Sequence, residues 1–105
     1  MLFRSIIRGG ENVPVAEVES LLYEHPAVRE VAVVAYPDER LGERACAVVV
    51  PEGAGPTLAG LQAHLEAQGM ARSFWPERLE LVEELPKTPS GKIQKFALRQ
   101  RMAAG

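Results

Sequence analysis

The sequence predicts an α+β domain: a small mixed sheet of about three core strands with flanking helices, in the order β-α-β-β-α-β-α. Two continuous apolar runs, residues 31–36 and 45–50, have the length and β-branched composition of strands buried on both faces. The chain has 105 residues, 47% hydrophobic and 25% charged, which is about one domain of ordinary globular composition. We therefore expect a single domain over residues 1–105, with helices packed on one sheet.

The N-terminal part predicts a short strand followed by a helix. Residues 5–8 form the strand, and Gly9 and Gly10 end it. Pro14 suits the first turn of the helix, and Pro26 ends it. Apolar residues at i, i+3 and i+7 give this helix one buried face: Val15, Val18 and Leu22.

The rest of the chain predicts a helix, a third core strand and a last helix. Thr57 fits the N-cap of the first of these helices, which Gly69 ends. Its apolar stripe consists of Leu58, Leu61 and Leu65. Residues 79–82 predict the strand, with Leu79 and Leu81 in the core and Glu80 turned outward. Residues 93–102 predict the last helix, with Ile93, Phe96 and Ala97 on its apolar side.

Several classes of protein are excluded by composition. No apolar run approaches the roughly 20 residues that span a bilayer, and residues 1–7 are too short and too soon charged for a secretory signal. The single cysteine, Cys46, excludes an internal disulfide and fits a reducing compartment, so we expect a cytoplasmic domain. Cys46 lies in mid-strand, where we expect a small buried hydrophobe rather than a nucleophile.

The net charge of −2 hides an asymmetry along the chain. Residues 1–84 hold 7 Lys or Arg against 14 Asp or Glu, whereas residues 85–105 hold 5 basic residues and no acid. A basic end on an acidic body indicates either contact with an anion or a solvated basic helix face. The acidic body and the lack of an aromatic and basic platform argue against nucleic acid.

The most informative segment is the loop that leads into this basic end, residues 86–92. Two prolines and a glycine restrain it, and Lys92 follows Gly91 directly. Lysine is a compact charge suited to phosphate or carboxylate oxygens, and Lys95 and Arg99 would share its face if the helix began there. A phosphate-binding P-loop is excluded, because it needs glycine where Pro86 stands and Ser or Thr where Ile93 stands. An ordinary solvated lysine in a surface turn is the alternative.

A second segment, Gly9–Gly10–Glu11, follows the first expected strand. Paired glycines allow a turn whose backbone N–H groups lie close to a ligand, although such turns often only connect elements.

The remaining residues that could carry chemistry are expected to have structural roles. His25 and His64 lie on different expected helices and lack the spacing of metal ligands, so we expect no metal site. The segment Phe74–Trp75–Pro76 is interpreted as a packing cluster, with docking against another domain as the alternative.

Together, the two segments resemble the C-terminal domain of adenylate-forming enzymes, the AMP-dependent synthetases and ligases that include acyl-CoA synthetases. The motifs that carry the resemblance are Arg8–Gly9–Gly10–Glu11–Asn12–Val13, Glu17–Val18–Glu19, Glu24–His25–Pro26–Ala27–Val28, residues 31–38, Gly42–Glu43, and Leu85–Pro86–Lys87–Thr88 with Ser90–Gly91–Lys92–Ile93. The last is the most specific, the first looks most like the acyl- and aryl-CoA ligase branch, and the resemblance covers essentially the whole chain.

The resemblance implies a role in two half-reactions. A carboxylic acid substrate attacks the α-phosphate of ATP to form an acyl-adenylate, and coenzyme A then displaces AMP. Lys92 matches the adenylation lysine, with Gly91 beside it at the ATP or adenylate. The segment of Gly9, Gly10 and Glu11 matches part of the coenzyme A channel, and Arg40, Gly42 and Glu43 are expected in a loop facing the larger domain. In some relatives the matching lysine is reversibly acylated, which implies the same possibility for Lys92.

The chain departs from the family pattern in two ways. Arg4 stands at the hinge position, where the family often has Asp. We also expect this sequence to lack the N-terminal adenylation domain, which holds the ATP, Mg²⁺ and acyl pockets in the family. We therefore expect no cofactor bound to this chain alone and no turnover by it. A standalone binding or regulatory module is the alternative, in which Lys87, Lys92, Lys95 and Arg99 hold an anionic partner.

Overall fold

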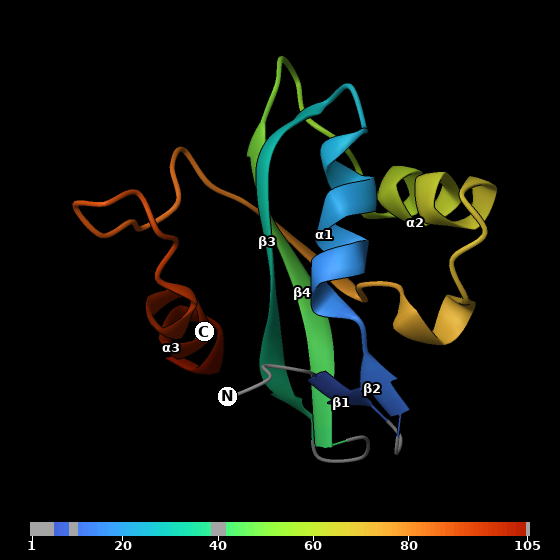
Figure 1. Cartoon of the computed structure of the whole chain (residues 1–105), viewed down its shortest axis with the longest axis horizontal. Coiled ribbons are helices and arrows are strands. Elements are labelled where there is room, and N and C mark those ends of the chain that lie inside the picture. The colour runs from blue at the N-terminus through green and yellow to red at the C-terminus, as the bar shows by residue number, and fades with distance from the viewer. Residues whose placement is uncertain (1–5, 9–10, 39–41, 105) are drawn as a thin grey trace.

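The computed structural model describes residues 6–8, 11–38 and 42–104, which form an α+β domain (Figure 1). Its strands are β1 (Ile6–Arg8), β2 (Glu11–Val13), β3 (Val28–Asp38), β4 (Gly42–Pro51) and β5 (Arg78–Leu81). Its helices are α1 (Val15–Tyr23), α2 (Leu58–Ala67), the 3₁₀ turn η1 (Arg72–Phe74) and α3 (Lys95–Ala104). None of the helices in these ranges is long and apolar enough to cross a lipid bilayer.

The sheet is built around β4. Its strand order is β2-β1-β4-β3, and β5 also pairs with β4. The β3–β4 pair is antiparallel from Val28↔Pro51 to Asp38↔Gly42, whereas β5 runs parallel to β4. The expected three-strand mixed core is therefore confirmed as β3, β4 and β5, and β3 lies at one edge of the described sheet.

The hairpin of β1 and β2 differs from the expected element order, which had one strand there. Residues 11–13 turn back on residues 6–8 and pair with them antiparallel. A strand of three residues, two of them polar, shows no alternation that a sequence pattern can detect.

Both faces of the β3–β4 pair are buried. One apolar cluster joins alternate strand residues to α1 and α2 and includes Leu22, Leu61 and Leu65. The other joins the intervening residues to α3 through Leu98 and to the following loop through Leu85. Figure 1 shows α1 and α2 on one side of the strands and α3 on the other. This arrangement explains why the strand sequences are continuously apolar.

The predicted caps of α2 are confirmed. The Thr57 hydroxyl accepts a hydrogen bond of 3.0 Å from the Gly60 N–H, which satisfies one free donor of the first turn. Gly69 follows the helix at a φ of +83°, a conformation that favours glycine. Pro14 stands at the N-cap of α1, one residue ahead of the first turn.

Leu81 is a correction to the expected core. It is 49% exposed, whereas Leu79 packs against the first cluster. Leu81 ends β5, where the strand leaves the sheet. Glu80 is half-buried and accepts a hydrogen bond of 2.9 Å from Arg78, so it is not simply turned outward.

Cys46 and the aromatic segment are packed as predicted. Cys46 is fully buried in β4, and burial raises the pKa of its thiol to about 12, which leaves it protonated and inert. Pro76 is buried, Phe74 and Trp75 pack against the first cluster, and the Trp75 indole donates to the Met70 carbonyl at 3.0 Å.

Candidate functional site

The loop that carries Lys92 is a closed hairpin. Lys87 and Ile93 form an antiparallel bridge at its base. Above them, the Thr88 N–H donates to the Lys92 carbonyl at 2.8 Å, and the Lys92 N–H donates to the Thr88 hydroxyl at 3.1 Å. We call residues 87–93 the Lys92 hairpin. Its backbone is satisfied internally, so Lys92 is presented from a defined loop.

Gly91 makes the turn of this hairpin possible. Its N–H donates to the Thr88 carbonyl at 2.8 Å, and its φ is +92°. Residues with a side chain rarely adopt this conformation, so the turn itself requires glycine here. The close approach of a ligand at Gly91 remains a prediction.

Gly91→Ala is expected to lower stability by about 1–2 kcal/mol. A Cβ at this position would meet no atom within 4 Å, so the whole cost is backbone strain. Gly53→Ala is the matched control, because Gly53 also has a positive φ, +65°, and open space. Urea unfolding should show a loss for both, and only Gly91→Ala should speed amide exchange at Lys92. If Gly91→Ala were as stable as the wild type, the expected backbone strain of alanine at this position would be contradicted.

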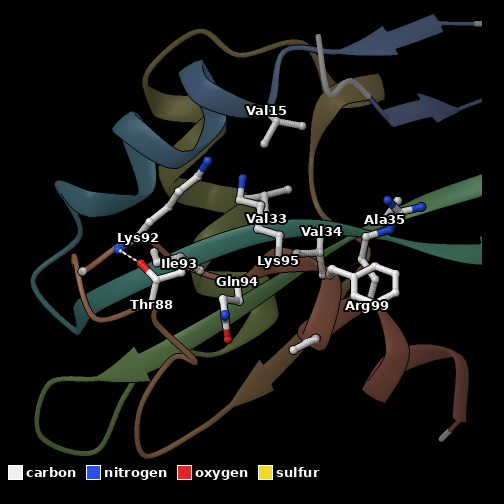
Figure 2. A pocket seen from close by; sticks show the side chains of 13 residues that line it. Val15, Val33, Val34, Ala35, Thr88, Lys92, Ile93, Gln94, Lys95 and Arg99 are labelled. Carbon is white, nitrogen blue, oxygen red and sulfur yellow. Dashed lines mark hydrogen bonds between the residues drawn. The ribbon is translucent and has the colours of Figure 1, made fainter. Parts of the chain in front are cut away.

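The Lys92 hairpin forms one end of an open groove of about 820 Å³. The floor is the edge of β3 at Val33, Val34 and Ala35, with Val15 of α1 on one side and α3 on the other. Figure 2 shows the Lys92 and Lys95 side chains extending in the same direction, toward α1. The groove combines an apolar floor with cationic side chains, which suits a partly apolar anion.

The neighbouring lysines are engaged, in contrast to Lys92. Lys87 Nζ lies 2.6 Å from Glu30 Oε1, and this hydrogen bond raises the pKa of Lys87. Lys95 Nζ lies 2.6 Å from Glu19 Oε2. Among the described residues, no carboxylate is found paired with Lys92, which is exposed. Lys92 is therefore a cation available to a bound anion.

The predicted start of the last helix is wrong. α3 begins at Lys95, because the Gln94 N–H donates to the Pro86 carbonyl at 2.8 Å and Ile93 belongs to the hairpin. Lys92 thus precedes the helix and does not share a helical face with Lys95 and Arg99. Phe96, expected in the core, is 65% exposed, and Leu98 is buried in its place.

The residues of the other predicted segment are only partly described. Arg4, Gly9, Gly10 and Arg40 lie outside the described residues. Glu11 begins β2, and Gly42 and Glu43 begin β4. Their roles at the hinge, the coenzyme A channel and the loop facing a larger domain remain predictions.

His25 and His64 lie in contact, although they are far apart in the sequence. Their ring centroids are 5.3 Å apart in an edge-on arrangement. His64 Nε2 donates to the Leu21 carbonyl at 2.7 Å, and His25 Nδ1 accepts from the Ala27 N–H at 3.0 Å. Within the part of the chain that the structure describes, no group of three or more potential ligands could hold a metal ion.

The surroundings of His25 are expected to make the stability of the domain sensitive to acid. Burial, and then the neighbouring His64, lower the pKa of His25 below its ordinary 6.5. The unfolded chain therefore binds the proton more readily, so stability is complete above about pH 6.5 and falls as the pH drops below it. Urea midpoints at about pH 7.5 and about pH 5.5 should differ more for the wild type than for His25→Asn, whose amide oxygen can still accept from Ala27. Equal losses of stability in the wild type and in His25→Asn would refute a role of His25 in acid sensitivity.

Glu19 and Glu30 are the functional neighbours that sequence reasoning missed as partners. Glu19 stands in a motif that was recognised, but nothing in a pattern of acidic residues shows which lysine each one meets. They come together only because α1 and the C-terminal segment both pack on β3.

Comparison with known proteins identifies the class of domain that this fold and hairpin define. Residues 17–92 match the model of the AMP-binding enzyme C-terminal domain. The chain belongs to this family, whose members occur in adenylate-forming ligases.

Individual relatives extend this result. The chain is 45% identical over 98 residues to the 2,3-dihydroxybenzoate-AMP ligase of Bacillus subtilis, covering 93% of this chain and 18% of that protein. It is 45% identical over 97 residues to the medium-chain fatty-acid–CoA ligase of Escherichia coli, covering 90% and 17%. The apo structure of MbtA from Mycobacterium smegmatis superposes with a TM-score of 0.90 at 47% identity, covering 93% and 19%. The chain spans about a fifth of the length of these relatives.

Proposed function

We propose that the chain acts as the mobile C-terminal domain of an AMP-forming acid ligase, and that Lys92 assists formation of the acyl-adenylate. The observation that supports this role is the contrast among three neighbouring lysines. Lys87 and Lys95 are held by carboxylates, whereas Lys92 is exposed at the groove on a closed hairpin. A preplaced cation of this kind is what the reaction needs.

In the proposed step, a carboxylate oxygen of the substrate bonds to the α-phosphorus of ATP and pyrophosphate leaves. The two reactants are both anions and repel each other as they approach, and negative charge builds up on the bridging oxygen that leaves with pyrophosphate. The Lys92 ammonium offsets that charge without taking part in bond formation, and Gly91 keeps the approach to it open.

The described residues fit only this part of the chemistry. No group of them could bind Mg²⁺ through three or more acidic, histidine or cysteine side chains. We therefore assign Mg²⁺, the nucleoside of ATP and the acyl group to the N-terminal adenylation domain that would accompany this chain. The acyl substrate is set by that domain, and the chain alone should not turn over.

For the second half-reaction, we propose that the segment of Gly9, Gly10 and Glu11 lines the path of coenzyme A, with Arg4 at the hinge. The strands that flank this segment lie at the lower end of β4 in Figure 1, apart from the loop that precedes α3. The relatives include an AMP ligase as well as a CoA ligase, so the thiol acceptor is part of the proposal.

The alternative, a standalone module that binds a polyanion, has less support from the charges. Two of the lysines that it requires, Lys87 and Lys95, already have carboxylate partners. A polyanion would have to displace these carboxylates or bind to fewer cations than the sequence displays.

A chimera tests the proposed function. The homologous C-terminal fifth of the E. coli medium-chain fatty-acid–CoA ligase is replaced by this chain, and fatty-acid-dependent ATP–pyrophosphate exchange is measured. We expect exchange well above that of the truncated ligase, while this chain alone releases no pyrophosphate. A folded chimera that stays at the truncated level would contradict the proposal. Salt-sensitive polyanion binding by the chain, without restored exchange, would favour the standalone module.

A further inference from the structure

Glu19 connects three elements through one carboxylate oxygen. Its Oε2 accepts a hydrogen bond of 2.7 Å from the Val33 N–H and lies 2.6 Å from Lys95 Nζ. Glu19 lies on α1, Val33 on the edge strand β3, and Lys95 is the first residue of α3. The Glu19 side chain is only 20% exposed, so both bonds are partly shielded from water.

The bond to Val33 fixes Glu19 itself. The Val33 N–H points away from β4, because it meets a side chain from α1 rather than the neighbouring strand. A donor at a sheet edge that is partly buried requires a partner, and Glu19 supplies it. This hydrogen bond orients the Glu19 carboxylate independently of Lys95.

The bond to Lys95 extends this orientation to the Lys92 hairpin. Lys95 follows Lys92 by three residues, and the Gln94 N–H between them donates to the Pro86 carbonyl at 2.8 Å. The base of the hairpin and the first turn of α3 are therefore one hydrogen-bonded unit. The ion pair that holds Lys95 therefore also fixes the position of the Lys92 hairpin relative to the rest of the domain.

The ion pair between Glu19 and Lys95 also gives Lys92 and Lys95 different roles. Lys92 and Lys95 both line the groove, and in Figure 2 their side chains extend in the same direction. Glu19 neutralises Lys95, which would otherwise repel Lys92 and compete with it for an anion in the groove. Glu19 leaves Lys92 as the lysine of this pair that can meet the anion.

We propose that Glu19 is a positioning residue, which sets the place of the Lys92 hairpin by holding Lys95 against β3. Its consequence for adenylation rests on the function proposed above, whereas its effect on the hairpin does not.

Hydrogen exchange of the whole chain tests the structural part. Glu19→Gln retains an oxygen for the Val33 N–H and removes the charge that holds Lys95. We expect the amides of Thr88, Gly91, Lys92 and Gln94 to exchange about tenfold faster, the size of one charge-assisted hydrogen bond, with less change at Val33. Glu17→Gln is the matched control, because Glu17 is an exposed acid on the same helix. Equal hairpin exchange in the two variants would overturn the proposal.

Catalysis in the chimera tests the functional part. Glu19→Gln should lower kcat for pyrophosphate exchange about tenfold, with KM for ATP nearly unchanged, and Glu17→Gln should not. Adding Lys95→Met to Glu19→Gln should cause little further loss, because both remove one bond; additive losses would contradict positioning through Lys95. If Lys92→Ala leaves exchange intact, the proposed function fails, whatever Glu19→Gln does to amide exchange. If Lys92→Ala abolishes exchange and Glu19→Gln moves neither readout, only the positioning role fails.

Discussion

Lys92→Ala is expected to lower the adenylation rate of the chimeric ligase by about 10²–10³-fold, the usual effect of removing one preorganised group that stabilises transition-state charge. The thioester half-reaction, started from supplied acyl-adenylate and coenzyme A, should continue at close to the parent rate. Pyrophosphate exchange and thioester formation report the two steps separately.

Arg101→Ala is the control for the Lys92 result. Arg101 is an exposed cation on α3, so this variant changes net charge equally without altering the Lys92 hairpin. It should retain both half-reactions. Equal loss of both half-reactions in Lys92→Ala, with the fold intact, would count against separate roles for the two segments.

Leu98→Ala is expected to destabilise the domain by about 2–5 kcal/mol. Leu98 is 1% exposed and inserts α3 into the second apolar cluster, beside Val34, Val48 and Leu85. No other described side chain of α3 is fully buried, so its truncation removes the main anchor of the helix. Urea unfolding of the whole chain measures the loss.

Leu81→Ala is the matched control for Leu98→Ala. It removes the same atoms from a side chain that is 49% exposed, so we expect less than about 1 kcal/mol. Similar losses at the two positions would mean that α3 does not depend on Leu98 for its docking.

The central fold could be predicted because its signals are local. The apolar runs of β3 and β4 are continuous, since each strand packs against helices on both faces. The caps at Thr57 and Gly69 follow from the chemistry of helix ends. The β1–β2 hairpin could not be predicted, because strands of three residues carry no period. The sequence places Phe96 in the core because it lies three residues after Ile93, which the pattern assigns to the same helix. Ile93 belongs to the hairpin instead, so it does not define the buried face of α3, and Leu98 packs into the core.

The candidate site could be predicted where it depends on one segment. Gly91 and Lys92 stand in a restrained loop whose residues lie next to each other in the sequence. The partners of the adjacent lysines could not be predicted, because Glu19 and Glu30 come from α1 and β3, more than 50 residues earlier. Such contacts depend on how α3 docks, which no local pattern encodes.

The position of β3 at the edge of the sheet, as far as the described residues show it, has a consequence for solubility. Residues 31–35 are all apolar, and an unpaired apolar edge is a template on which a second chain can add a strand. In this domain, α1 and α3 flank that edge and Glu19 occupies one of its donors. Variants that loosen α3 therefore uncover an aggregation-prone segment, and self-association is the form in which their lost stability would first be seen during purification.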